Sequence, residues 1–213
     1  MRRLILQCYA MTLYDDKEEM VREVSLVKNA DWIAYTYRHR KAFAYCAEKL
    51  IHEPVLREEM LRRAEVHDMD KMLMYLFLDQ HTSQILHVQN KAHHLENNLP
   101  KSYEDLVETV IDYECAPYTK PDKPLNAWDF VHKLKEMNLL DDETAEQLCS
   151  IMHELGIDRS DTVSSDAEGM AYIRQFSEVT EEMIMEEILR YVNEHPDNEL
   201  DWILDQVRAG VRL

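Results

Sequence analysis

The chain has 213 residues and carries 42 acidic against 24 basic side chains, which gives a formal net charge of −18. This charge repels the backbone of a nucleic acid, so we expect a small substrate rather than a polymer. No run approaches the roughly 20 apolar residues that a membrane-spanning helix needs, so we expect no membrane insertion.

The length is typical of one domain, or of one domain with a helical appendage. We predict a metal-binding helical domain over residues 1–138 and an acidic helical region over residues 139–213, which packs on that domain or binds a partner. The first 155 residues contain no glycine, whereas phosphate-binding loops of the Rossmann and P-loop types require it. Both folds are therefore excluded, and the abundance of Leu, Met, Glu, Ala and Lys predicts an all-α protein.

The cysteines are scattered and form no CxxC motif. Such spacing predicts reduced thiols in a cytoplasmic protein rather than a disulfide framework. A short apolar run follows Arg2 and Arg3, but Asp15 and Asp16 come soon after it, so we interpret the N-terminal segment as folded and retained. The four cysteines are Cys8, Cys46, Cys115 and Cys149.

In chain order, the first half of the sequence predicts helices over residues 31–50, 55–78 and 82–96. Pro54 lies just beyond the first helix, and residues 97–100, which include two asparagines and a proline, end the third.

A further helix is predicted to open at Ser102, because Asp105 three residues later completes a pattern that resembles a capping box. We expect this helix to carry Asp112, to reach about Ala116 and to stop before Pro117.

Beyond a proline-rich stretch, a helix is expected over residues 127–137. Asp142 can cap the next helix, and Gly156 is expected to end it. Residues 157–169 are polar and are predicted to form a loop.

The C-terminal tail is predicted to hold an amphipathic helix that starts at Thr180 and a short helix over residues 200–208. It contains no motif that indicates chemistry.

The most informative motif is His67-Asp68-Met69-Asp70-Lys71. Its adjacent His and Asp need partners to hold a metal, and other predicted helices offer them. His39 upstream and Asp112 downstream would give two imidazoles and two carboxylates, with water in the remaining positions. Lys71 lies one turn after His67 and is predicted to bind a phosphoryl oxygen or to balance the carboxylates.

Imidazole and carboxylate together suit a divalent transition metal, so the sequence predicts one or two ions of Mn, Fe, Co, Ni or Zn. Such a centre lowers the pKa of bound water and favours hydrolysis. Arg38 and Arg40 lie beside His39 and are predicted to contact phosphate on the substrate.

This ordered set resembles the HDxxK version of the HD-domain signature. That superfamily comprises helical metal-dependent phosphohydrolases and a few diiron oxygenases. A narrower resemblance is to a group of bacterial and phage proteins without an assigned activity, and it covers about residues 31–135. The shared elements read here as HDxxK, His93-His94-Leu95-Glu96-Asn97 and Asp112-Tyr113-Glu114-Cys115-Ala116.

The resemblance implies an HD-like helical bundle with an additional C-terminal helical segment. It also implies hydrolysis of a small phosphate ester or nucleotide, with metal-bound water as the nucleophile. His94, with His87 seven residues before it, would then complete a second metal site, while His93 would orient substrate. Asp70 or Glu96 would serve as general base, although Asp70 replaces the glycine that many HDxxK phosphodiesterases carry and so weakens any transfer of their cyclic-dinucleotide substrate.

Two alternatives stay open. One is a diiron oxygenase on the same scaffold, and the other is a non-catalytic helical protein whose acidic surface binds a basic partner. A homo-oligomer is compatible with either.

Overall fold

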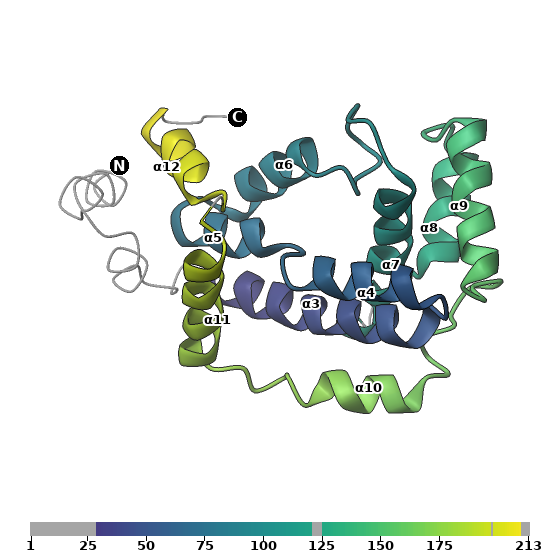
Figure 1. The fold of residues 1–213 in the computed structure, drawn as a ribbon, viewed down its shortest axis with the longest axis horizontal. Coiled ribbons are helices and arrows are strands. Elements are labelled where there is room, and N and C mark those ends of the chain that lie inside the picture. Colours follow the sequence, from purple (N-terminus) through teal and green to yellow (C-terminus); the bar gives the residue numbers. More distant parts are fainter. Residues whose placement is uncertain (1–28, 121–124, 197, 210–213) are drawn as a thin grey trace. The chain divides into compact units, whose positions relative to one another are not determined.

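The computed structural model describes residues 29–120, 125–196 and 198–209. Within these ranges the regular structure is helical and contains no strand, which confirms the predicted all-α class (Figure 1). The predictions for the N-terminal segment and for Cys8 lie outside the described residues. The helices are α3 (Ala30–Leu50), α4 (Pro54–Ala64), α5 (Met69–Phe77), α6 (Gln80–Asn90), α7 (Tyr103–Thr119), α8 (Ala127–Glu136), α9 (Asp142–Glu154), α10 (Ala167–Arg174), α11 (Glu181–Glu194) and α12 (Leu200–Ala209).

Among the described helices, none combines the length and the apolar character that crossing a bilayer requires.

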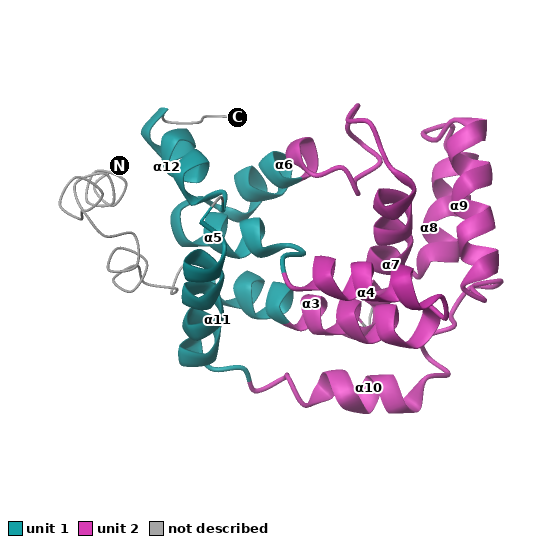
Figure 2. Cartoon of the chain, in the orientation of Figure 1, with its two compact units in different colours: residues 1–37, 66–87, 179–213 teal, residues 38–65, 88–178 magenta. Residues whose placement is uncertain are grey.

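The chain forms two compact units, which Figure 2 colours separately. Unit 1 comprises residues 1–37, 66–87 and 179–213, and unit 2 comprises residues 38–65 and 88–178. The predicted division at residue 138 follows chain order, whereas each of these units is assembled from separate stretches of the chain.

Unit 1 is built around α5, which packs against α11 and α12. Every residue of α5 except Lys71 is buried, and all of the buried ones except Asp70 are hydrophobic. The two C-terminal helices cover it with their apolar faces, on which Ile188 and Ile203 are fully buried. Asn29 stabilises the C-terminal end of α5, because its side chain donates to the carbonyls of Tyr75 and Leu78, each at 2.8 Å.

Unit 2 is organised around α7, against which α4, α8, α9 and α10 pack. Its core includes fully buried aliphatic and aromatic side chains from α3, α4, α7 and α9. Phe43, Met60, Ile111 and Leu148 are examples, and their burial provides the main driving force for folding of this unit.

The predicted helix over residues 55–78 is wrong in one respect, because two helices occupy it. Glu53 caps α4 by accepting from the backbone N–H groups of Val55 and Leu56. At the other end, Arg40 donates to the carbonyls of Ala64 at 3.4 Å and Glu65 at 2.6 Å. These contacts satisfy helix-end groups and let the chain leave the helix before α5 begins.

The predicted helix over residues 82–96 ends earlier, at Asn90. The Asn97 side chain donates to the carbonyls of Val88 and Lys91, each at 2.6 Å, and so replaces the next helical turn. His93 and His94 consequently lie in turns after α6, not on a helix.

Capping residues and a glycine in the sequence predicted several other helix ends correctly. Ser102 and Asp105 form the capping box of α7, and Thr180 caps α11 through the N–H of Met183. Gly156 adopts a φ of 73° just after α9, in agreement with its predicted role as a helix stop.

Three details differ from expectation. Asp141, rather than Asp142, caps α9. Helix α7 continues through Pro117 to Thr119, because a proline in the last turn removes only one backbone hydrogen bond. The end of the predicted loop over 157–169 contains the start of α10, which Asp166 caps by accepting from the N–H of Gly169.

Candidate metal centres

Asp68 occupies the junction before α5 in an unusual backbone conformation. Its φ of 58° lies in the left-handed region, which residues other than glycine rarely adopt. An aspartate at this position normally caps the helix, but the Asp68 side chain makes no cap hydrogen bond. The left-handed turn instead holds a carboxylate that is only 3% exposed, with one oxygen 3.0 Å from Lys71 Nζ.

His87, on α6, lies between two carboxylates of unit 1. Its Nδ1 is 2.8 Å from Asp70 Oδ2, and its Nε2 is 3.1 Å from Asp68 Oδ1. A neutral imidazole carries a proton on one nitrogen and a lone pair on the other. Each ring nitrogen of His87 therefore faces a carboxylate, and only a nitrogen that carries no proton can bind a cation.

The charges around Asp68 keep it ionised. Burial alone would raise the pKa of this carboxyl, but the charges of Lys71, His67 and His87 outweigh burial and hold the pKa well below its usual range. The Nε2 atom of His67, one of the groups that lower this pKa, lies 4.0 Å from Asp68 Oδ1. The result is a buried anion, the form in which a carboxylate binds a metal.

Asp68, Asp70 and His87 are named here the unit 1 cluster. They offer one ligand atom each, and these atoms all lie within 4.8 Å of one another. Lys71, predicted to act in catalysis, adjoins this cluster through Asp68.

A second group lies within unit 2 and combines α3 with α7. His39 Nε2 is 2.6 Å from Asp112 Oδ1, so the structure brings together two residues predicted as ligands. Cys115 adds a thiol that the sequence prediction missed, 3.6 Å from His39 Nδ1. The signal that could have found it is its spacing, because it follows Asp112 by three residues and shares its helix face. His39, Asp112 and Cys115 are named the unit 2 cluster.

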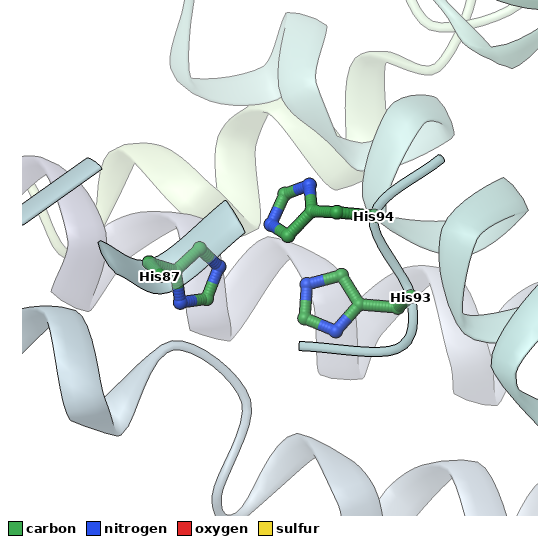
Figure 3. Close-up of side chains that lie close together, drawn as sticks. All are labelled: His87, His93 and His94. Atoms are coloured by element: carbon green, nitrogen blue, oxygen red, sulfur yellow. The ribbon is translucent and has the colours of Figure 1, made fainter. Parts of the chain in front are cut away.

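His93 and His94 leave the same short segment after α6, and Figure 3 shows their rings next to each other. The ring centroids are 4.3 Å apart, and both residues are buried. Lys101 holds this segment by donating to the carbonyl of His94 at 2.7 Å. Thr109 donates to the carbonyl of His93. The segment therefore has a fixed backbone although it is not helical.

Glu108 was not predicted, yet it positions His93. Its Oε1 is 3.2 Å from His93 Nδ1, and its Oε2 accepts from Arg63 at 2.8 Å. Arg63 also donates to Glu59 and Asp105. Although burial would lower the pKa of Arg63, these carboxylates raise it, so the guanidinium stays charged and fixes Glu108.

The remaining predicted site residues have different surroundings. Arg40 is buried and donates to carbonyls at the end of α4, while Arg38 on α3 is half-buried. Glu96 is exposed, and its Oε2 is 3.8 Å from His94 Nδ1. The phosphate contacts of the two arginines and the general-base role of Glu96 stay predictions.

The predicted ligands are divided between the units. His67, Asp68 and His87 belong to unit 1, whereas His39, Asp112 and His94 belong to unit 2. Each unit by itself gathers donors that could hold a divalent transition metal, since imidazole, carboxylate and thiolate are its common protein ligands.

Comparison with protein-family models, with curated proteins and with solved structures finds no match to this chain.

Proposed function

We propose that this protein is a metal-dependent phosphohydrolase of the HD type, which acts on a small phosphate ester or a nucleotide. The proposed metal ligands are His67, Asp68 and His87 in unit 1 and His39, Asp112 and His94 in unit 2. The order of these residues along the chain, with Lys71 after the His-Asp pair, resembles the HDxxK signature.

The observation that carries the proposal is the buried carboxylate of Asp68. A left-handed backbone conformation in a non-glycine residue costs on the order of 1–3 kcal/mol, and such residues cluster at functional sites. Here it directs an ionised oxygen to within 3.1 Å of His87 Nε2. A buried anion beside an imidazole nitrogen is a suitable environment for a divalent cation.

Asp70 supports the same proposal from the other side of the His87 ring. Histidines that bind a metal usually donate their second N–H to a carboxylate or carbonyl, which fixes the tautomer and the ring orientation. Asp70 Oδ2, 2.8 Å from His87 Nδ1, is placed to accept that proton and to leave Nε2 for the metal. Asp70 is thereby proposed as a positioning residue rather than as the general base predicted from the sequence.

A bound divalent ion would lower the pKa of an attacking water and polarise a phosphoryl oxygen. The side chains of the protein would bind the substrate and balance the negative charge of its phosphate. Lys71 Nζ, 3.0 Å from Asp68 Oδ2, is half-buried and carries the positive charge that a phosphate oxygen needs.

The test compares the native protein with Asp68→Asn, because asparagine tolerates the left-handed conformation and removes only the charge. Metal content is measured after reconstitution with Mn, Fe, Co, Ni or Zn, and phosphate release is then screened with phosphate esters and nucleotides. Asp79→Asn is the matched control, since Asp79 also lies in unit 1 but accepts from Thr82. We expect Asp68→Asn to lose the ion of the unit 1 cluster together with turnover, and Asp79→Asn to keep both.

Three results would overturn the proposal. The first is a folded native protein that binds no metal after reconstitution, and the second is metal binding without release of phosphate from any substrate. The third is two equivalents of iron with absorption that responds to oxygen, which would favour the diiron oxygenase instead.

A further inference from the structure

Cys115 is the one donor of the unit 2 cluster that the HD-type proposal does not use. It lies on α7, three residues after Asp112, and is fully buried. The thiol donates to the carbonyl of Asp112 at 3.2 Å, and its Sγ lies 3.6 Å from Nδ1 and 3.9 Å from Nε2 of His39. Among the cysteines that the structure describes, Cys115 forms no disulfide.

Both other donors lie near Nε2 of His39, with Cys115 Sγ at 3.9 Å and Asp112 Oδ1 at 2.6 Å. With metal–sulfur and metal–nitrogen bonds of about 2.3 and 2.0–2.1 Å in tetrahedral geometry, the sulfur and nitrogen lie roughly 3.6 Å apart. One donor atom each from His39, Asp112 and Cys115 lies within 4.8 Å of the other two. An ion at Nε2 requires the Asp112 carboxylate, now 2.6 Å from this nitrogen, to move outward, because two ligands at about 2.0–2.1 Å from one tetrahedral ion lie roughly 3.4 Å apart.

We infer that the unit 2 cluster binds a thiophilic divalent cation, such as zinc or cobalt, with the Cys115 thiolate as a ligand beside His39 and Asp112. Metal binding breaks the S–H bond, forms the metal–sulfur bond and releases the proton to water. The inference rests on the proposed metal role of His39 and Asp112 and specifies the ion. Thiolate favours zinc or cobalt over magnesium and calcium, which prefer oxygen ligands.

The protein around the thiol is suited to this role. His39 is 5% exposed and Asp112 has a side chain that is 14% exposed, so the cluster is shielded from water on most sides. Exclusion of water strengthens the attraction between the ion and its anionic ligands. The two helices that carry the cluster are also part of the unit 2 core, through Phe43 of α3 and Ile111 of α7.

The test is a cobalt titration of the full chain after removal of metal with a chelator. A near-ultraviolet band from thiolate-to-cobalt charge transfer reports the sulfur ligand without any assay of activity. We expect the band in the native protein and its loss in Cys115→Ser. We also expect Cys115→Ser to bind cobalt more weakly, by at least the roughly 10–100-fold that loss of an outer-sphere partner produces, and to release one proton fewer per ion.

Cys8→Ser and Cys149→Ser are matched controls and should keep the band, which would assign it to the remaining buried thiols. Cys46→Ser then separates Cys115 from Cys46 and should also keep it. If Cys115→Ser does not fold, His39→Asn provides the second variant, because it preserves the thiol and should still abolish the band.

The outcomes separate this inference from the proposed hydrolase. Cobalt binding and phosphate release without a charge-transfer band would overturn the thiolate ligand and leave the hydrolase intact. A band without turnover of any phosphate ester would support the thiolate ligand and contradict the hydrolase. Failure of the folded native protein to bind cobalt would overturn the thiolate ligand, whereas the hydrolase is overturned only if none of the five metals binds.

Discussion

Glu114 is a buried carboxyl that connects three parts of unit 2. Its two oxygens accept from the backbone N–H of Ala127 at 3.2 Å and from the hydroxyl of Thr162. Burial raises the pKa of Glu114, and the charge of Asp129 adds to this, while the hydrogen bonds only partly oppose it. The residue therefore holds its proton more strongly in the folded protein than in the unfolded chain.

This difference predicts how stability depends on pH. Because the folded state binds more protons, the free energy of unfolding should fall as pH rises from the ordinary glutamate pKa of about 4.3 through the raised value. Glu114→Gln removes the titration. Urea unfolding at several pH values should show that the native protein loses stability relative to this variant as pH increases. A constant difference between the two proteins would contradict the raised pKa.

Asp68 illustrates what sequence reasoning captured at the residue scale and what it missed. The adjacent His and Asp were sufficient to predict a candidate ligand, since residue types alone indicate metal chemistry. The positive φ of Asp68 was not predictable, because aspartate also adopts ordinary negative φ values and the neighbouring residue types do not require a left-handed conformation.

At the scale of elements, α10 is attached to unit 2 through Asp166. This carboxylate caps α10 and accepts from Tyr118 at 2.5 Å and Tyr45 at 3.1 Å, and Lys49 completes an ion pair at 2.5 Å. Burial would raise the pKa of Asp166, but Lys49 and the tyrosines lower it to about 2. The cluster explains why a polar stretch that predicts a loop nevertheless ends in an ordered helix.

At Gly169, the backbone of α10 lies very close to the side chains of Asp166, Tyr45 and Tyr118. A Cβ added there would lie 2.4 Å from Asp166 Oδ2, 2.6 Å from Tyr45 Cε1 and 2.7 Å from Tyr118 Cε1. Alanine normally stabilises a helix relative to glycine by up to about 1 kcal/mol. Here overpacking should reverse the sign, so Gly169→Ala should lower the free energy of unfolding by about 1–3 kcal/mol in denaturant titrations.

Gly156→Ala is an informative comparison for that measurement. A Cβ at Gly156 would meet nothing within 4 Å, but the φ of 73° is unfavourable for alanine. Gly156→Asn should recover part of the loss, because asparagine tolerates the left-handed region, whereas Gly169→Asn should be worse than Gly169→Ala. A Gly169→Ala protein as stable as the native one would show that the aromatic rings move away without cost.

Elements whose ends depend on neighbouring residues were predictable, and those set by distant side chains were not. The Ser102–Asp105 capping box and the Thr180 cap are complete within a few residues. The end of α6 depends instead on Asn97, which replaces a helical turn with side-chain hydrogen bonds. His93 and His94 were consequently assigned to a helix, and the contact of His93 with Glu108 was missed.

At the scale of the whole molecule, the C-terminal tail contributes to both units. Residues 139–178 belong to unit 2, whereas α11 and α12 belong to unit 1 and cover α5. The sequence prediction treated this tail as one acidic region. Charge dominates its composition, but the apolar faces of α11 and α12 determine where it packs.

Truncation after Glu178 should therefore expose α5 rather than remove an independent appendage. We expect limited proteolysis to cut the shortened chain within residues 66–87, and we expect the metal bound by the unit 1 cluster to be lost. Helical content, measured by circular dichroism, should fall by more than the share that α11 and α12 contribute. Protection of residues 66–87 in the shortened chain would contradict the role assigned to these helices.

Point variants on α11 test the same role without deleting any residue. Ile188 is fully buried, whereas Met183, on the same helix, is 41% exposed. Ile188→Ala should lower the free energy of unfolding by about 2–5 kcal/mol, because it removes buried methyl groups and leaves a cavity. Met183→Ala should change it by only about 0.5 kcal/mol. If the tail were a loosely attached appendage, both variants would leave α5 protected from proteolysis and would retain metal at Asp68.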